Sequence, residues 1–210
     1  DNLPILLQEI DAAIKPLNTT YEVIFVDDKS TDRSLDVMRE LKRKNSNVRI
    51  LRHGINSGES ATSLTGIAHA RGEIVITIDS DLQNDPADIP LLLSLLTDGV
   101  AAVCGVRRKR EDDWVKRISS RLANKFRNAV TGDSIADAGC TYRAIRRTAF
   151  RDIPVFNGLH RFLPTLLRMQ GFKVVEVKVN HRPRTAGVSK YGVGNRAWRG
   201  VVDCMAMRWF

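Results

Sequence analysis

Apolar and polar positions follow two different periods along the first half of the chain. Four segments carry apolar residues at helical spacing and are predicted as helices: residues 2–14, 30–44, 57–71 and 88–96. Four short runs rich in β-branched residues are predicted as strands: residues 21–28, 48–53, 73–81 and 101–107. Strands that alternate with helices and are apolar on both faces are typical of an α/β fold, with a mostly parallel sheet flanked by helices.

The pattern changes after Arg107. Residues 114–132 predict one long helix, in which apolar residues recur every third or fourth position and cations lie between them. Such a basic amphipathic helix can lie at a lipid surface. An ordinary packed helix with a solvated basic face is the alternative. Strand-like stretches follow at 139–147 and 172–181. The length of 210 residues suits one substantial domain, and we expect a single domain over residues 1–210.

Charge is distributed unevenly between the two halves. The 210 residues include 33 Lys and Arg and 24 Asp and Glu, a net charge of +9. Residues 1–104 hold 10 basic and 16 acidic side chains, whereas residues 105–210 hold 23 basic and 8 acidic ones. The first half therefore suits a bound cation, and the second suits an anionic partner such as nucleic acid, a membrane surface or a phosphorylated substrate. A basic surface that is merely solvated is the alternative.

Cysteine usage and hydropathy exclude several classes of protein. Cys104, Cys140 and Cys204 lie far apart and lack C-x-x-C spacing. This argues against a disulfide framework or a zinc site and is typical of a reducing compartment. The sequence has no apolar run of about 18 residues or more and no opening signal peptide, so we expect no transmembrane helix within it.

Two predicted strands end in carboxylates, at Asp27 and Asp28 and at Asp79 and Asp81. Ligands of open α/β sheets bind at the carboxyl ends of the strands. Asp79 and Asp81 are two positions apart, so in an extended segment they would point the same way. Adjacent like charges favour a cation between them, and Mg²⁺ is typically held by one or two carboxylates plus substrate phosphates. The pattern predicts a clamp for a diphosphate through Mg²⁺ or Mn²⁺; a capped turn with solvated aspartates is the alternative.

Five ordered blocks, which together cover nearly the whole chain, resemble the inverting family 2 glycosyltransferases. They are "VIFVDDKSTDRS", "GIAHARGEIVITIDSDLQNDPADIP", "GVRRKREDDWVKRISSRLANKFRN", "HRFLPTLLRMQGFKVVEVKVNHRPR" and "GVSKYG". They are similar in particular to the branch of dolichyl-phosphate mannose synthase and the bacterial polyprenyl-phosphate glycosyltransferases. The resemblance implies the GT-A (Rossmann-like) fold. It also implies transfer of a sugar from a UDP- or GDP-linked donor to undecaprenyl or dolichyl phosphate.

The same resemblance implies roles for individual residues. It implies that the metal ligands are Asp79 and Asp81 and that the catalytic residues are Asp79, Asp81, Arg107 and Arg121. The implied donor-binding residues are Asp27, Asp28, Asp79, Gln83, Arg182, Arg184, Ser189 and Lys190, the last four in a loop that closes over the donor. The implied acceptor-binding residues are Arg107, Arg117, Arg121, Lys125, His160 and Arg161. Residues 1–107 would then be the nucleotide-sugar and metal half, and residues 108–210 the acceptor and membrane-facing half.

The resemblance also sets expectations for the surroundings of the protein. The expected partners are the nucleotide sugar, polyprenyl phosphate and the lipid surface, without nucleic acid; a homo-oligomer is compatible with the sequence. The expected location is the cytoplasmic face of the inner (plasma) membrane. Family members begin with a strand and a "P-x-x-N-E" turn, and many continue into transmembrane helices. Because this chain starts at "DNLPILL" and stops at "MRWF", we expect both segments to be absent from it.

Two other functions compete with this interpretation. A family 2 enzyme with a soluble or polysaccharide acceptor would not need the basic helix, and would more often carry a "Q-x-x-R-W" block, which the sequence lacks. A non-enzymatic nucleic-acid-binding protein would use the basic half. However, an aromatic share of 6% is low for stacking on single strands, and no nucleic-acid-binding module is recognisable. The sequence does not identify the sugar or the base.

Overall fold

The computed structural model describes residues 2–107, 127–151, 153–156 and 158–183 of the chain. Its longer elements, in chain order, are α1 (Asn2–Ile14), β1 (Val23–Asp27), α2 (Ser34–Lys44), β2 (Val48–Arg52), α3 (Gly58–His69), β3 (Ile74–Thr77), α4 (Ile89–Ser94), β4 (Val100–Arg107), β5 (Arg143–Arg146), α6 (Leu159–Met169) and β6 (Lys173–Val179). Every helix and strand predicted before Arg107 is present, and most ends lie within a few residues of the prediction. The predicted helix 114–132 lies outside the described residues except for its end, where residues 127–131 are helical.

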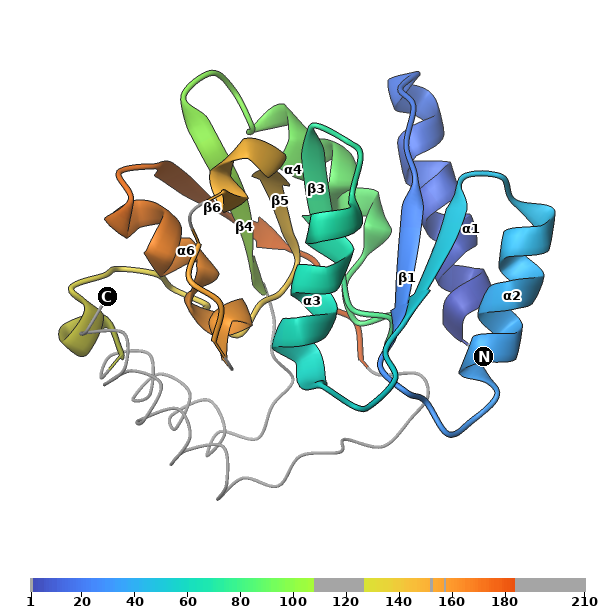
Figure 1. Ribbon diagram of the computed structural model, residues 1–210. Helices are drawn as coiled ribbons and strands as arrows, with labels where there is room; N and C mark the ends of the chain where they lie inside the picture. The colour runs from blue at the N-terminus through green and yellow to red at the C-terminus, as the bar shows by residue number, and fades with distance from the viewer. Residues whose placement is uncertain (1, 108–126, 152, 157, 184–210) are drawn as a thin grey trace.

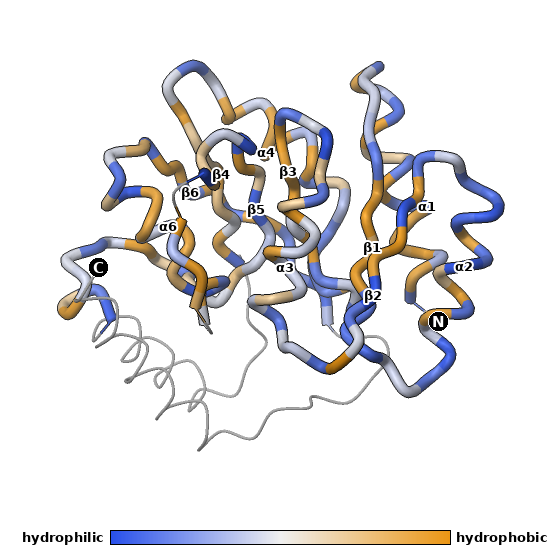
Figure 2. Tube along the Cα trace, in the orientation of Figure 1, coloured by the Kyte–Doolittle hydropathy of each residue, from blue (hydrophilic) through white to orange (hydrophobic). Residues whose placement is uncertain are grey.

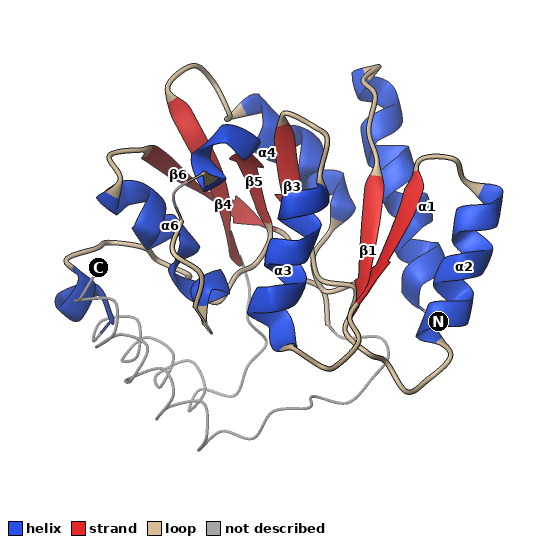
Figure 3. Cartoon of the chain, in the orientation of Figure 1, coloured by secondary structure: helices blue, strands red, loops and turns tan. Residues whose placement is uncertain are grey.

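The strands form two hydrogen-bonded sheets. Strands β1 and β2 pair in parallel, whereas the larger sheet has the order β3-β5-β4-β6. In the larger sheet β4 and β6 are parallel, and β5 runs antiparallel to both of its neighbours. Figure 3 shows the two sheets side by side with helices around them. The prediction of an α/β fold with a mostly parallel sheet is confirmed, with β5 as the antiparallel exception.

Helices cover both faces of the larger sheet (Figure 1). One face packs against α6, whose Leu163 and Leu167 lie in the same cluster as Ile145 of β5. The opposite face packs against α1 and α4, where Leu92 lies in the same cluster as Val103 of β4. Each such buried side chain contributes roughly 2 kcal/mol from apolar surface removed from water. Figure 2 shows the matching pattern, with apolar residues on the strands and hydrophilic ones on the outer side of α2.

This architecture brings the strand ends together. Strands β1, β3 and β4 all finish along the lower side of the sheets in Figure 1, and their last residues are Asp27, Thr77 and Arg107. Because β5 is antiparallel to β3, its first residue, Arg143, lies opposite Thr77 at this same edge. Residues from distant parts of the chain therefore lie together at this lower edge of the sheets.

Candidate functional site

The loop after β3 carries the two aspartates that were predicted to bind a metal. Strand β3 ends at Thr77, and the chain turns around residues 80–82, so the prediction that Asp79 and Asp81 lie in one extended segment is wrong. The turn places Leu82 at φ 63°, a left-handed conformation that costs an ordinary residue about 1 kcal/mol. Leu82 is only 5% exposed, and its burial in the core offsets that strain. The core thus fixes the shape of the loop.

The segment that leads into β5 holds this loop from the side. Thr141 donates a hydrogen bond of 2.8 Å to Oδ2 of Asp79, and the hydroxyl of Thr77 donates to the carbonyl of Thr141. Tyr142 donates from its hydroxyl to the carbonyl of Asp85 at 3.0 Å. Within the described residues, Oδ1 of Asp79 accepts no hydrogen bond. One oxygen of Asp79 is therefore oriented by the protein, and the other is available to a cation.

Electrostatics at Asp79 favour such a cation. Protein atoms around its carboxyl remove much of its solvation, and this raises its pKa above the usual value, although the residue as a whole is exposed. The hydrogen bond from Thr141 and the charges of Arg107 and Arg143 oppose the rise, whereas the charge of Asp81 adds to it. A carboxyl that is crowded by a second carboxylate gains more than an isolated one when a cation binds between them.

Arg107, the last residue of β4, is fixed beside the acidic loop, which comprises residues 78–85 after β3. Its Nε and Nη2 each donate a 2.7 Å hydrogen bond to the carboxylate of Asp137, a bidentate arrangement. A Cβ added at Gly139 would lie 3.0 Å from Nη2 of Arg107, so the glycine leaves room for the guanidinium. The side chain of Arg107 is 15% exposed. The guanidinium is therefore oriented before any ligand arrives, and its charge reaches Asp79.

The carboxylate of Asp28 is bound to the start of α3. The amides of Ser57 and Gly58 each donate to it at 2.8 Å, and Nδ1 of His53 lies 2.8 Å from its Oδ1. Burial alone would raise the pKa of Asp28, but these three hydrogen bonds outweigh it and hold the pKa below its usual value. Asp28 is thus an anion that anchors α3. Its predicted role in donor binding stays a prediction.

Its neighbour Asp27 is buried at the end of β1 and is 1% exposed. Oδ1 of Asp27 accepts a hydrogen bond from the amide of Ser30 at 3.0 Å. Oδ2 lies 3.2 Å from Nε of Arg52, close enough for an ion pair, although the geometry is not that of a hydrogen bond. Asp27 therefore stabilises the turn after β1 and is less accessible to a donor than Asp28.

Gln83 and Arg182, both predicted to bind the donor, lie next to each other. The amide of Arg182 donates to the carbonyl of Gln83 at 2.7 Å. The Arg182 guanidinium is held by Glu9, with oxygens at 2.8 and 2.9 Å from Nη1, and by Asp85, 2.7 Å from Nη2. This ion-pair network attaches the segment after β6 to α1 and to the acidic loop. The predicted contact of Arg182 with the donor stays a prediction.

His160 and Arg161, predicted at the acceptor, lie in the first turn of α6. Nδ1 of His160 is 2.8 Å from the hydroxyl of Ser60, and its Nε2 is 3.5 Å from Glu59. The carbonyl of His160 accepts a 2.6 Å hydrogen bond from Nη1 of Arg143. The start of α6 is therefore joined to α3 on one side and to β5 on the other.

The remaining predicted site residues lie outside the described residues: Arg117, Arg121, Lys125, Arg184, Ser189 and Lys190. In the described ranges, no group of three or more His, Cys, Asp and Glu side chains is placed to bind a metal by itself. None of the helices in those same ranges combines the length and the apolar character needed to cross a bilayer.

Three residues of the site were missed by the sequence analysis: Asp137, Thr141 and Arg143. The available signal was the run "DAGCTYR", in which an acid, a glycine and polar side chains directly precede a β-rich stretch. Its partners, Arg107 and Asp79, lie 30 and 62 residues away in sequence, and only the antiparallel pairing of β5 with β3 and β4 brings them together.

Comparison with known structures shows the fold. Glucosyl-3-phosphoglycerate synthase from Mycobacterium tuberculosis, in complex with Mg²⁺ and uridine diphosphate, superposes with a TM-score of 0.71 at 19% identity, over 96% of this chain and 73% of that one. A mannosyltransferase from Pyrobaculum calidifontis, in complex with GDP-Man and Mn²⁺, superposes with a TM-score of 0.61 at 19% identity, over 98% of this chain and 59% of that one. The GT-A fold expected from the resemblance is confirmed.

Comparison of sequences shows the family. The chain is 36% identical over 194 residues to an undecaprenyl-phosphate 4-deoxy-4-formamido-L-arabinose transferase from Edwardsiella ictaluri, over 92% of this chain and 60% of the relative. The enzyme of the same name from Aeromonas hydrophila is also 36% identical, over 91% of this chain and 59% of the relative. The chain thus spans about 60% of the length of these relatives. The family model of glycosyl transferase family 2 matches residues 3–154, and the chain therefore belongs to glycosyl transferase family 2.

Proposed function

We propose that this protein is an inverting glycosyltransferase that moves a sugar from a nucleotide diphosphate sugar to the phosphate of a polyprenyl phosphate. The observation that carries the proposal is that Asp79, in the loop after β3, interacts electrostatically both with Asp81 and with Arg107 at the end of β4. Carboxylates and a guanidinium at one edge of the sheet suit a diphosphate with its cation. The names of the two bacterial relatives supply the acceptor, undecaprenyl phosphate.

The residues present fit a divalent metal. Asp79 offers an oxygen that makes no hydrogen bond within the described residues, and Asp81 adds a second carboxylate nearby. Mg²⁺ and Mn²⁺ take oxygen ligands and commonly bind through one or two carboxylates plus substrate phosphates, so a complete protein cage is not required. When bound, such an ion supplies Lewis-acid stabilisation of the negative charge on the departing diphosphate.

The protein's own contribution is orientation. Asp137 fixes the Arg107 guanidinium with two hydrogen bonds, and we assign the charge of this guanidinium to the phosphate groups that would bind at the same edge. Preorganised charge of this kind stabilises developing negative charge without reorganisation during the reaction. Asp28, which is hydrogen-bonded to His53, holds the start of α3, and we assign this part of the edge to the nucleoside of the donor.

The acceptor chemistry explains why a general base is not needed. A phosphate monoester has a second pKa of about 6, so it is mostly ionised near neutral pH and is already nucleophilic. Its attack from the face of the sugar opposite the departing diphosphate inverts the anomeric configuration, through an oxocarbenium-like state. Among the described residues, we assign Arg107 at the end of β4, together with His160 and Arg161 in the first turn of α6, to the acceptor side.

The proposal extends to organisation and location. We assign residues 1–107 to the donor and residues 108–210 to the acceptor within one catalytic domain. The protein works at the cytoplasmic face of the inner membrane, because the acceptor phosphate is carried by a lipid. As the family resemblance implies, we assign Arg117, Arg121 and Lys125 to the acceptor and Arg184, Ser189 and Lys190 to the donor, in keeping with the 23 Lys and Arg of the second half.

A panel of nucleotide sugars tests the proposal. The full-length protein is incubated with each UDP- or GDP-linked sugar, with Mg²⁺ or Mn²⁺, and with polyprenyl phosphate, and the glycolipid product is quantified. Because of the names of the relatives, nucleotide-linked 4-deoxy-4-formamido-L-arabinose is included in the panel. Transfer to the lipid supports the proposal. Transfer only to soluble phosphates or to polysaccharide supports the alternative acceptor class, and no metal-dependent cleavage of any donor contradicts both.

A further inference from the structure

The first turn of α6 is held from two sides by buried polar side chains. From β5, Nη1 of Arg143 donates to the carbonyl of His160 at 2.6 Å. From α3, the hydroxyl oxygen of Ser60 accepts from the amide of Gly158 at 2.9 Å and lies 2.8 Å from Nδ1 of His160. Arg143 is 2% exposed and Ser60 is 6% exposed, so neither side chain is merely solvated.

Stability alone does not explain Arg143. Its hydrogen-bond acceptors are two backbone carbonyls, those of His160 and, at 3.2 Å, Ala138, and its buried Nε has no hydrogen-bond partner. Among the described residues no carboxylate forms an ion pair with this guanidinium. Asp79 interacts electrostatically with Arg143 but forms no ion pair with it. Burying a cation without a direct ion pair costs free energy, and an apolar side chain of similar size would stabilise a central strand better. A cation retained at such a cost is expected to serve the site.

The two carbonyls bound by Arg143 belong to two functional segments. Ala138 directly follows Asp137, which orients Arg107 with its bidentate hydrogen bonds. His160 lies in the first turn of α6 and directly precedes Arg161. A planar guanidinium donates in fixed directions. Arg143 therefore sets the distance between the segment that orients Arg107 and the turn that carries His160.

We propose that Arg143 and Ser60 are positioning residues that hold the first turn of α6 against the Arg107 side of the site, and so fix where the acceptor phosphate binds. The inference rests on the proposed function, because it gives an acceptor-side role to that turn. Neither residue contacts a substrate in this proposal. Both act through His160 and Gly158, so their loss affects acceptor binding more than donor binding.

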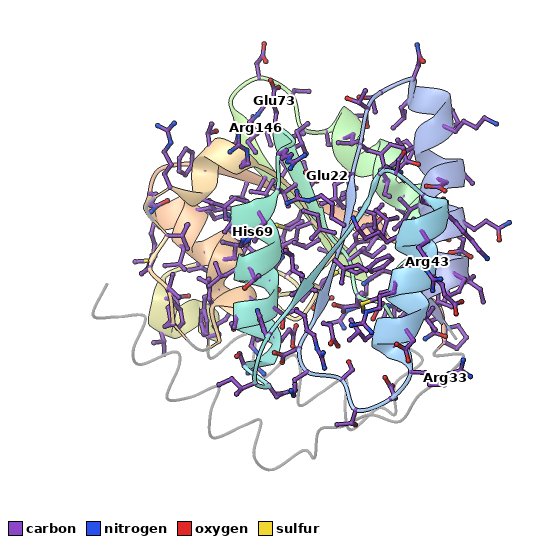
Figure 4. All side chains as sticks on the ribbon, turned by 45° about the vertical axis from the view of Figure 1, so that its right-hand side comes forward. Glu22, Arg33, Arg43, His69, Glu73 and Arg146 are labelled. Carbon is purple, nitrogen blue, oxygen red and sulfur yellow. The ribbon has the colours of Figure 1, made fainter. Side chains whose placement is uncertain are left out.

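The substitution Arg143→Lys tests this role, because lysine keeps the charge but loses the rigid fork. The expected result is a rise of about tenfold in KM for polyprenyl phosphate, as for the loss of one charge-assisted hydrogen bond, with KM for the nucleotide sugar unchanged. Arg146→Lys is the matched control. Arg146 is also in β5 and donates to carbonyls, those of Val100, Leu96 and Thr97, but it lies opposite Ile74, at the other end of the sheet beside Glu73 (Figure 4). It should leave both KM values unchanged.

Ser60→Ala is the second test and decides the matter if Arg143→Lys does not fold. It removes the tether from α3 and should raise KM for the acceptor about threefold, again without a change in KM for the donor. The inference is overturned if a folded variant leaves the acceptor KM unchanged, raises both KM values equally, or matches Arg146→Lys. If the wild-type protein transfers no sugar to polyprenyl phosphate, both the proposed function and this inference are wrong. If the wild type transfers sugar to polyprenyl phosphate but the variants keep its KM for the acceptor, only this inference is wrong and the proposed function stands.

Discussion

The hydroxyl of Thr141 donates a hydrogen bond of 2.8 Å to Oδ2 of Asp79, a residue 62 positions earlier in the chain. This contact joins the start of β5 to the acidic loop after β3. It fixes one oxygen of a carboxylate that is crowded by Asp81, and the other oxygen accepts no hydrogen bond from the described residues. The geometry of the proposed metal site therefore depends on a neutral side chain that binds no metal itself.

Replacement of Thr141 by valine should weaken metal binding. Without its hydrogen bond the pKa of Asp79 rises further, so protons compete better with the ion and the defect grows as the pH falls. We expect the Mn²⁺ concentration for half-maximal transfer to rise about fivefold, which corresponds to the loss of one hydrogen bond. Thr141→Ser keeps the hydroxyl and should behave as the wild type. Equal Mn²⁺ requirements for the valine and serine variants would contradict this assignment.

Removal of the negative charge that orients Arg107 should slow transfer. Asp137→Asn keeps the shape of the side chain but loses one of the two acceptor oxygens that lie 2.7 Å from Nε and Nη2 of Arg107. We expect kcat to fall about thirtyfold, because hydrogen bonds to charged groups are worth about 2 kcal/mol. Steady-state kinetics measure this, with Asp98→Asn in an exposed loop as the control. An unchanged kcat in a folded Asp137→Asn protein would remove Asp137 from the account.

The close packing around Gly105 predicts that a larger residue there would destabilise the protein strongly. A Cβ there would lie 2.9 Å from Cγ2 of Val179, 3.0 Å from the carbonyl oxygen of Tyr142 and 3.2 Å from Sγ of Cys140. Gly105→Ala should therefore lower the free energy of unfolding by about 2 kcal/mol through overpacking. Gly54→Ala, where nothing lies within 4 Å, should be neutral. Urea denaturation compares the two variants, and equal midpoints would mean that β4 and β6 are packed less closely than described.

The ion pair of Asp133 and Arg168 predicts how stability depends on pH. Burial alone would raise the pKa of Asp133, but hydrogen bonds from Thr165 at 2.5 Å and Arg168 at 2.7 Å outweigh it and hold the pKa below its usual value of 3.8. Since the folded state favours the carboxylate, the contribution to stability is complete above that value and is lost as the pH falls through the lower folded pKa.

Asp133→Asn should therefore be less stable than the wild type at pH 7, by about 2 kcal/mol, and less sensitive to acid. Urea midpoints measured at decreasing pH should converge between the two proteins below a pH of about 4. If the urea midpoints of the two proteins fall in parallel as the pH decreases, Asp133 is not the residue that makes the stability of the fold sensitive to acid.

Much of the fold could be predicted from the sequence because it depends on the local periodicity of apolar residues. The helical spacing in residues 2–14 and the apolar run before Arg107 correspond to α1 and β4. The residue at which β3 ends could not be predicted from the sequence. It depends on Leu82, whose burial in the core favours a left-handed turn that no local preference of leucine predicts. The antiparallel course of β5 is likewise a long-range property of strand pairing.

The site shows the same division. Asp79 and Asp81 were predicted because they come at the end of a predicted strand, and strand ends meet at one edge of the sheet. Arg107 was implied by the resemblance to family 2 glycosyltransferases. Arg182 was predicted for the donor, but its guanidinium is held by Glu9 of α1, a partner 173 residues away that no motif indicated. Long-range ion pairs of this kind depend on how α1 packs against the sheet, and that packing is not encoded in the spacing of the motif.

The central claim is that the acidic loop after β3 holds the metal ion that binds the donor diphosphate. Its most direct test is the rate of metal-dependent transfer to polyprenyl phosphate in the wild type, in Asp81→Ala and in the control Asp98→Ala, all confirmed to be folded. The account predicts a loss of more than about a hundredfold in Asp81→Ala and a wild-type rate in the control. Full transfer activity in Asp81→Ala would contradict it.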